Sequence, residues 1–375
     1  MTRITRSSAI VFALTAMLAL SACSTTASAE TDSSSAPNPG AADARAFLDD
    51  YLENPTSIGL ETALSAAPDS DRSIIYLLSP GPVAEVASNA LATASAEVGW
   101  DYSAIAAGAT PASAASAFEA AIARGPDAII FAGYPAATFT KQIADANAAG
   151  ITVLSNATGD DPVDGVLADI GGRADEEQFG KLTAAYFVSN AGPDDKAVVF
   201  NLSAFPILSL FTDAFVASVE DWCPDCEVEV VDQQFGDVGI NTPANTVSYL
   251  QRNPDVKWAF YANGDLAQGV SAAVKGAGLE GIHIVGEVPT QANLANLATG
   301  EEAAWTGYPV DILSWRMIDL LARHFGGDDV AAAAAVTLPL QLITSDNVGD
   351  IVTRDGYYIG VDGFEDQFRA LWKAS

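Results

Sequence analysis

Two successive series of short apolar runs alternate with alanine-rich segments, and this alternation constrains the fold more than any other feature. The first series runs from SIIYLL at 73–78 to ITVLSN at 151–156, and the second from KAVVFNL at 196–202 to IHIVGE at 282–287. The segments between the runs have helical periodicity, and glycine ends several of them. Strands that alternate with helices of roughly 10–15 residues predict βαβ units and parallel sheets. We therefore expect an α/β protein with two similar Rossmann-like lobes.

Further runs predict crossings between these lobes. DGVLADIGG at 164–172 lies between the two series, AAWTGY at 303–308 precedes a predicted helix, and the tail holds a third crossing. Three connections would form a multi-strand hinge. The predicted N-terminal lobe is 72–168 with 309–345, the C-terminal lobe is 169–308, and the last crossover and tail are 346–375. Residues 41–71 are predicted to be an extension packed on the outside, without a functional signal.

The first 22 residues have the pattern of an export signal. Two arginines precede the apolar run Ile10–Leu20, whose eleven or so residues are too few for the roughly 20 that span a bilayer. The next residues, LSAC at 20–23, resemble the lipobox of bacterial lipoproteins. In that family the cysteine is acylated and becomes the mature N-terminus, and more than one acyl chain anchors a protein stably. The alternative is a plain signal peptide followed by an incidental cysteine.

The resemblance to a lipobox implies that residues 1–22 are removed and that Cys23 carries the lipid. Residues 23–40 are polar and low in complexity, so they predict a flexible tether. We expect the protein on the extracytoplasmic side of the cell membrane, held by this anchor.

The charge balance excludes one class of partner. The chain has 48 acidic and 17 basic residues, a net charge of −31, and without the two arginines of the signal the net charge is near −33. Nucleic-acid binding requires clustered lysine and arginine, so we expect no nucleic-acid partner. The acidic surface is typical of a soluble, solvated protein.

The other two cysteines, Cys223 and Cys226, form the motif CPDC. Outside the cytoplasm a structural disulfide is the favoured interpretation, with a free or redox-active pair as the alternative. A zinc site would need two further ligands, and the two histidines of the chain, His283 and His324, are distant in sequence. We therefore expect no metal.

Enzymatic motifs are missing from the sequence. SPGPV follows the first strand where a dinucleotide site would have GxGxxG, and neither GxSxG nor HExxH occurs. Two isolated histidines provide little for general base catalysis. We expect neither an enzyme nor a cofactor.

The order of elements resembles the ribose-binding-protein-like group of solute-binding proteins of bacterial ABC importers. The resemblance covers about residues 72–325 and is carried by GPDAIIFAGYPAATFTKQIADANAAGITVLSN at 125–156 and RNPDVKWAFYANGDLAQGVSAAVKGAGL at 252–279. It implies the sugar-binding type of periplasmic binding protein, a monomer that closes on a solute and delivers it to ABC permease subunits. A receptor with the same lobes, partnered by a membrane sensor kinase, is the alternative.

In such folds ligands bind outside the carboxyl ends of the parallel strands, so candidate residues are read from the predicted strand ends. The candidates are Ser79, Tyr134 and Asn156 in the first lobe, Phe205, Phe235, Asn263 and Glu287 in the second, and Tyr308 at the return crossing. Each has a structural alternative: the asparagine can cap a helix, the aromatic rings can pack in turns or the core, and Glu287 can be a solvated charge at a strand end.

The resemblance also implies which solute groups the pocket holds. Sugar binders of this group usually hold hydroxyl groups with an aspartate–arginine pair and a further aspartate. Here Ser155 and Asn156 occupy the first place, and Glu287 and Val288 the second, while Asn263 matches the ligand asparagine of the group. We expect a small polar solute, a sugar or polyol, with a modified sugar or another small polar molecule as alternatives.

Overall fold

The computed structural model describes residues 38–192 and 194–372, apart from the Phe235 side chain. The predicted signal peptide, Cys23 and most of the tether lie outside the described residues. No helix in the described part of the chain is long and apolar enough to cross a membrane.

The first lobe is built on a parallel sheet with the strand order β2-β1-β3-β4-β5. Its strands are β1 (Ser73–Leu78), β2 (Asp101–Ala106), β3 (Ala128–Ala132), β4 (Thr152–Asn156) and β5 (Asp169–Ile170). Its helices are α2 (Pro82–Glu97), α3 (Pro111–Arg124), η1 (Ala136–Phe139) and α4 (Thr140–Ala148).

Both faces of this sheet are covered, which explains its continuous apolar strands. In β1, Ile74 and Tyr76 face the cluster that contains α2. Ile75 and Leu77 face the cluster that contains α3 and α4. Because neighbouring side chains of a strand point to opposite faces, a run such as SIIYLL buries side chains on both sides.

The second lobe is built on a sheet with the order β11-β10-β9-β8-β6-β7. Its strands are β6 (Lys196–Asn201), β7 (Val228–Asp232), β8 (Val256–Tyr261), β9 (His283–Glu287), β10 (Ala304–Gly307) and β11 (Gln341–Thr344). Its helical segments are α5 (Arg173–Asn190), α6 (Pro206–Trp222), η2 (Phe235–Asp237), α7 (Thr242–Arg252), η3 (Gly264–Ala267), α8 (Val270–Gly276) and α9 (Gln291–Ala298). Helices α5 and α6 pack closely at Gly180, where a Cβ would lie 2.5 Å from the Phe211 carbonyl oxygen.

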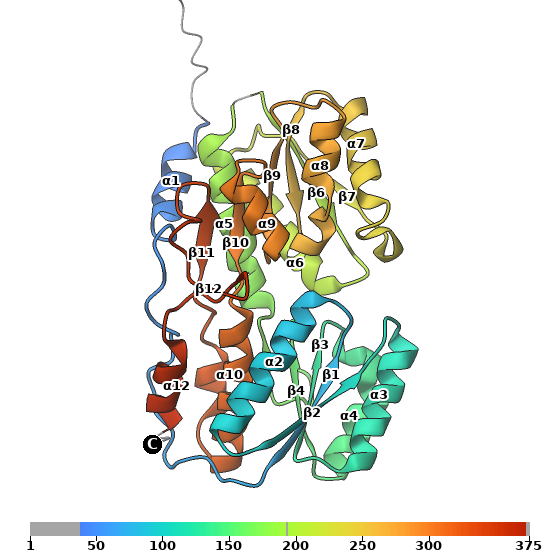
Figure 1. Ribbon diagram of the computed structural model, residues 1–375, viewed down its shortest axis with the longest axis vertical. Coiled ribbons are helices and arrows are strands. Elements are labelled where there is room, and N and C mark those ends of the chain that lie inside the picture. The colour runs from blue at the N-terminus through green and yellow to red at the C-terminus, as the bar shows by residue number, and fades with distance from the viewer. Residues whose placement is uncertain (1–37, 193, 373–375) are drawn as a thin grey trace, which may run out of the picture. The chain divides into compact units, whose positions relative to one another are not determined.

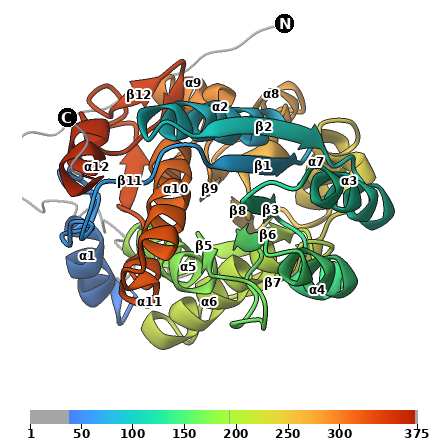
Figure 2. The same ribbon diagram turned by 90° about the horizontal axis from the view of Figure 1, so that it is seen from below.

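The remaining elements follow the return crossing. They are α10 (Val310–Gly326), α11 (Val330–Ala334), the hairpin β12 (Thr353–Arg354) and β13 (Tyr357–Tyr358), and α12 (Phe364–Trp372). Helix α10 packs beside α2 on the first lobe, as Figures 1 and 2 show from two directions.

Two predicted lobe boundaries are wrong. Strand β5, at residues 169–170, pairs with β4 and belongs to the first sheet. Strand β11, at residues 341–344, pairs antiparallel with β10 and belongs to the second sheet, not to the first lobe with 309–345. The boundaries were wrong because strands pair with segments that are distant in sequence. Strand β11, for example, hydrogen-bonds to the backbone groups along the otherwise open edge of β10.

The N-terminal extension is tied to both lobes. Helix α1 (Ala41–Asp49) packs on α5, and the chain then runs beside α10 and α12 (Figure 1). The Leu342 amide donates to the Tyr51 carbonyl at 2.8 Å, and the Leu64 amide to the Leu371 carbonyl at 2.9 Å. The predicted tether is too long at its end, because the Asn38 side chain already donates to the Val188 and Ala191 carbonyls, both at 3.2 Å.

The predicted disulfide between Cys223 and Cys226 is present just after α6. No group of three or more potential metal-ligating side chains occurs among the residues that the structure describes.

Candidate functional site

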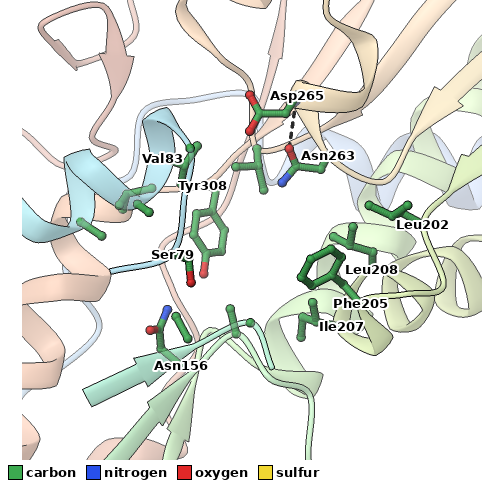
Figure 3. A pocket seen from close by; sticks show the side chains of 18 of the residues that line it. Ser79, Val83, Asn156, Leu202, Phe205, Ile207, Leu208, Asn263, Asp265 and Tyr308 are labelled. Carbon is green, nitrogen blue, oxygen red and sulfur yellow. Dashed lines mark hydrogen bonds between the residues drawn. The ribbon is translucent and has the colours of Figure 1, made fainter. Parts of the chain in front are cut away.

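A cavity of about 280 Å³ lies where the strand ends of the two sheets face each other (Figure 3). Because liquid water takes up about 30 Å³ per molecule, this volume suits a small solute. Seven of the eight candidate residues line the cavity: Ser79, Tyr134, Asn156, Phe205, Asn263, Glu287 and Tyr308. The eighth, Phe235, begins η2, and because its side chain is not described its role stays a prediction.

The first-lobe wall is uncharged. Ser79 follows β1, Tyr134 follows β3, and Asn156 ends β4. The Asn156 side-chain oxygen is buried and has no hydrogen-bond partner within the described residues. The next residue, Ala157, has a φ of +50°, so the backbone leaves the strand end in a conformation that residues other than glycine rarely adopt.

Asn263 in the second-lobe wall has two roles. Its side-chain oxygen accepts a hydrogen bond from the Asp265 amide at 2.9 Å and caps η3, so the capping alternative is correct. The same side chain also lines the cavity beside Asp265 (Figure 3). Its oxygen is used by the cap, which leaves the Asn263 NH₂ group as the hydrogen-bond donor for a solute.

Glu287 is fully buried rather than solvated, which excludes the predicted alternative of a strand-end surface charge. It ends β9, its exposed fraction is 0%, and its carboxyl oxygens accept no hydrogen bond from an N–H or alcohol group of the described chain, so their partner is the Glu176 carboxyl. Burial and the nearby Glu176 carboxyl raise the pKa of Glu287 well above its usual range. Val288, directly after it, has a φ of +51°, which is unusual for a β-branched residue.

Glu176 lies in the first turns of α5 and is 3% exposed. Burial raises the pKa of Glu176 to about 8, and the Asp175 charge adds to the rise. At neutral pH and without a ligand, the carboxyl groups of Glu176 and Glu287 therefore keep at least one proton between them. Asp265 is a third acidic residue of the wall, and burial raises its pKa as well.

Tyr308 connects β10 to α10 at the crossing between the lobes and is 8% exposed. Its ring packs edge-on against Phe179 with 5.6 Å between the ring centroids. A Cβ on Gly171 would lie 2.5 Å from the Tyr308 hydroxyl, and Gly171 has a φ of +62°. Glycine at position 171 therefore allows Tyr308 to reach the cavity.

Two aromatic rings from opposite lobes meet beside the cavity. Tyr134 follows β3 of the first lobe, and Phe205 precedes α6 of the second, with 6.0 Å between their ring centroids. Burial raises the pKa of Tyr134, so its hydroxyl stays protonated at neutral pH. This contact joins the lobes in the conformation that the structure describes.

Sequence reasoning missed most of the aliphatic wall. The cavity is also lined by Val83, Ala84, Ala87, Leu202, Ile207, Leu208, Val238, Leu266, Val288, Val310 and Leu313. Glu176 and Asp265 were not among the eight candidates. Asp265 had a signal, since it lies two residues after the candidate Asn263, in the same strand-end stretch 263–265. Glu176 had none, because the segment RADEEQFG contains three successive acidic residues and no pattern identifies the one that faces inward.

The chain matches the family model described as periplasmic binding protein domain over residues 78–329. A search among curated proteins found no match.

Many solved structures share the fold. An ABC sugar transporter subunit from Rhodobacter sphaeroides 2.4.1 is 20% identical with a TM-score of 0.64, over 74% of this chain and 99% of that one. An ABC transporter solute-binding protein from Agrobacterium vitis with bound allitol is 20% identical with a TM-score of 0.64, over 75% and 98%. The fructose-binding periplasmic domain of a hybrid two-component system is 18% identical with a TM-score of 0.63, over 75% and 92%.

Proposed function

This chain belongs to the periplasmic binding protein domain family, and from that premise we propose that it is the solute-binding subunit of an ABC importer. The family is extracytoplasmic and consists of binding proteins rather than enzymes. The observation that carries the proposal is the cavity between the strand ends of two lobes, lined by unpaired polar side chains from both. In this architecture a ligand binds at the carboxyl ends of the strands.

Binding proceeds by closure of the lobes. The solute first meets one wall, and rotation about the connections at β5, β10 and β11 brings the other wall onto it. The contact between Tyr134 and Phe205 helps to hold the closed form. The closed form, as a monomer anchored through a lipid on Cys23, then delivers the solute to the permease.

The solute is small and polar, of the size of a sugar or polyol. The cavity volume supports this size, and one structural neighbour holds allitol. The hydrogen-bonding groups available are the amides of Asn156 and Asn263, the hydroxyls of Ser79 and Tyr308, and the carboxyls. Recognition uses hydrogen bonds and ring contacts, without covalent chemistry.

The first experiment is a thermal-shift screen of the exported chain, with Cys23→Ser to prevent acylation, refolded from denaturant to remove bound solute. The library contains sugars, polyols, sugar acids, amines and amino acids. A compound that binds only the folded state adds about 2.7 kcal/mol to the free energy of unfolding at 100 times its Kd. This gain raises the melting temperature. We expect at least one compound to do so.

The matched variants are Asn263→Ala, which removes a cavity donor, and Asn89→Ala, which changes an exposed residue of α2. The first variant should lose the shift and the second should keep it. If no compound stabilises a protein that circular dichroism shows to be folded, the solute-binding proposal is wrong.

A second function has one specific observation in its favour. A structural neighbour of similar score belongs to a hybrid two-component system, so a receptor that signals to a membrane sensor kinase uses the same lobes. Measuring solute uptake in cells that lack this protein distinguishes the importer from the receptor. Loss of uptake supports the importer. Intact uptake together with a lost transcriptional response supports the receptor.

A further inference from the structure

The charges on the cavity wall are unbalanced. Glu176, Asp265 and Glu287 all line the cavity, and no lysine, arginine or histidine lines it among the described residues. None of the three takes part in an ion pair within the described ranges 38–192 and 194–372, where the ion pairs use other acidic residues. Whatever neutralises these carboxyl groups must therefore be a proton or a part of the solute.

The acidic residues next to this pair have their own partners. Asp175 accepts a hydrogen bond from the Leu338 amide at 2.6 Å, and the Arg316 guanidinium lies near it. Asp169 accepts hydrogen bonds from the Ser155 hydroxyl at 2.8 Å and the Gly159 amide at 3.1 Å. These two residues are structural acids.

Glu287 differs from the structural acids, because its buried oxygens accept no hydrogen bond from an N–H or alcohol group of the described chain and meet only the Glu176 carboxyl, with which they share a hydrogen-bonded proton. A shared proton satisfies one acceptor of the pair and leaves the other oxygens to the cavity. Burying a carboxyl group without a hydrogen-bond partner is costly, and an ionised one more so. A pair of such groups facing a cavity is explained when the ligand brings the missing donors.

The rest of the wall argues against a solute covered with hydroxyl groups. The aliphatic side chains from α2, α6 and α10 offer no hydrogen bonds. Each hydroxyl placed against them would lose its bonds to water without replacement. The rings of Tyr134, Phe205 and Tyr308 can instead contact apolar groups, and their faces attract cations.

We propose that the solute is an organic cation: a protonated amine binds at the Glu176–Glu287 end of the cavity, and its carbon body packs against the aliphatic wall. Asp265 contributes further negative potential from the same lobe. This inference rests on the proposed solute-binding function and names the class of its solute.

Binding of a cation is coupled to proton release. The raised pKa values mean that the empty pair retains a proton at neutral pH, whereas an ammonium group favours the ionised pair. The charged or titratable groups that face the pair are Asp175, Asp169 and Tyr308, with Arg316 acting on Asp175. Asp175, Asp169 and Tyr308 are not cations, so none of them can take the place of the solute's charge beside the pair. As the pH rises from 6 to 8 the pair loses its proton more readily, and its affinity for an amine should therefore rise.

The test is isothermal titration calorimetry of the refolded, exported chain with matched pairs of compounds. Each pair exchanges an ammonium group for a hydroxyl group: cyclohexylamine and cyclohexanol, 4-aminobutanol and 1,4-butanediol, glucamine and sorbitol. We expect an amine to bind at least about tenfold more tightly than its neutral partner, since a buried charge pair contributes more than a neutral hydrogen bond. Titration in buffers of different ionisation enthalpy should show about one proton released per amine bound.

The matched variants are Glu287→Gln, which removes the charge and keeps the shape, and Glu177→Gln, which changes an exposed residue of α5. The first should weaken amine binding at least about 30-fold and lower the number of protons released, because Glu176 remains as one titrating group, and the second should change neither. If Glu287→Gln does not fold, Glu176→Gln replaces it.

The outcomes separate this inference from the function on which it rests. If a neutral compound binds as tightly as its amine partner, or an amine binds without proton release, the cation proposal is wrong and the solute-binding function stands. If no compound of any class binds to the folded protein, both are wrong.

Discussion

The two walls of the cavity differ in charge although the two lobes share an architecture. The first-lobe wall consists of uncharged residues such as Ser79, Tyr134 and Asn156. The second-lobe wall carries all three carboxyl groups, those of Glu176, Asp265 and Glu287. The same β–turn–α geometry thus places a neutral surface opposite an acidic one.

This difference assigns separate tasks to the two walls. The acidic wall selects the charge of the solute, because desolvated carboxyl groups interact strongly with a cation. The neutral wall can approach and leave without separating buried charges, so closure requires less desolvation on that side.

The largest expected effect is the dependence of stability on pH. The folded pKa of Glu176 is about 8, above an unfolded value near 4.3. A raised pKa gives stability that is fully present below the unfolded pKa and is lost as the pH rises through the folded pKa. In the absence of solute, we expect the free energy of unfolding in urea to fall by on the order of 4 kcal/mol between pH 5 and pH 9.

Variants on the acidic wall identify the source of this slope. Glu287→Gln should flatten the pH dependence in part, because it removes one of two groups with a raised pKa, while burial keeps the pKa of Glu176 raised. Glu177→Gln, on the exposed face of α5, should leave the slope as it is. A wild-type free energy of unfolding that stays constant from pH 5 to pH 9 would mean that the acidic wall holds no extra proton.

The next largest effect concerns the glycine that gives Tyr308 its place between the walls. Gly171→Ala adds a Cβ 2.5 Å from the Tyr308 hydroxyl at a φ of +62°. We expect thermal unfolding to show a loss of about 2–3 kcal/mol, part from backbone strain and part from displacement of the ring.

Gly125→Ala is the matched control, because Gly125 has a φ of +64° and no neighbour within 4 Å of an added Cβ. It should lose about 1 kcal/mol from backbone strain alone and keep its solute affinity, whereas Gly171→Ala should also weaken binding. Equal losses of stability in both variants would show that the contact with Tyr308 is unimportant.

A smaller effect is expected on the neutral wall. Asn156→Ala removes a hydrogen bond to the solute and should lower the affinity about tenfold, which corresponds to roughly 1–1.5 kcal/mol. The affinity should keep its pH dependence, in contrast to Glu287→Gln. Calorimetry at pH 6 and pH 8 tests this, and a pH dependence lost in Asn156→Ala would mean that the walls do not act separately.

The smallest effect concerns the ring contact that joins the walls. Phe205→Ala removes the contact with Tyr134, and an aromatic pair contributes about 0.5–1.5 kcal/mol. We expect a several-fold loss of affinity through faster solute dissociation, measured by stopped-flow fluorescence. Phe205→Tyr keeps a ring at this position and should retain the wild-type rate. If Phe205→Ala dissociates no faster than wild type, the ring contact does not stabilise the closed form.

Local patterns account for what the sequence predicted well. The buried strands are short apolar runs between turn signals, so strands such as β1 and β4 could be located within a few residues. In a fold of two such lobes the ligand binds outside the carboxyl ends of the strands of both sheets, which is why residues as distant in sequence as Asn156 and Asn263 could be expected at one cavity. The disulfide of CPDC was predicted from the export pattern, because structural disulfides are favoured outside the cytoplasm, and it is present.

Non-local pairing accounts for what the sequence left open or had wrong. Strand β11 joins β10 after a long excursion through α10 and α11, and no local pattern reveals which sheet it completes. Glu176 is inward and Glu177 is exposed, although both are glutamates in the same turn of α5. The cap and the cavity role of Asn263 coexist, so the two interpretations did not compete.

The sequence alone determined the two series of βαβ units, the export pattern with its candidate lipidation site, the acidic composition and the strand ends at which a solute would bind. Composition needs no structure at all, and the other features depend on residues that are neighbours in the chain. The tertiary structure alone decided the character of the cavity. It brought Glu176 of α5 beside Glu287 of β9, buried both away from any described cation, and closed aliphatic side chains of both lobes around them. A carboxyl group's charge depends on its surroundings, and only folding assembles those surroundings.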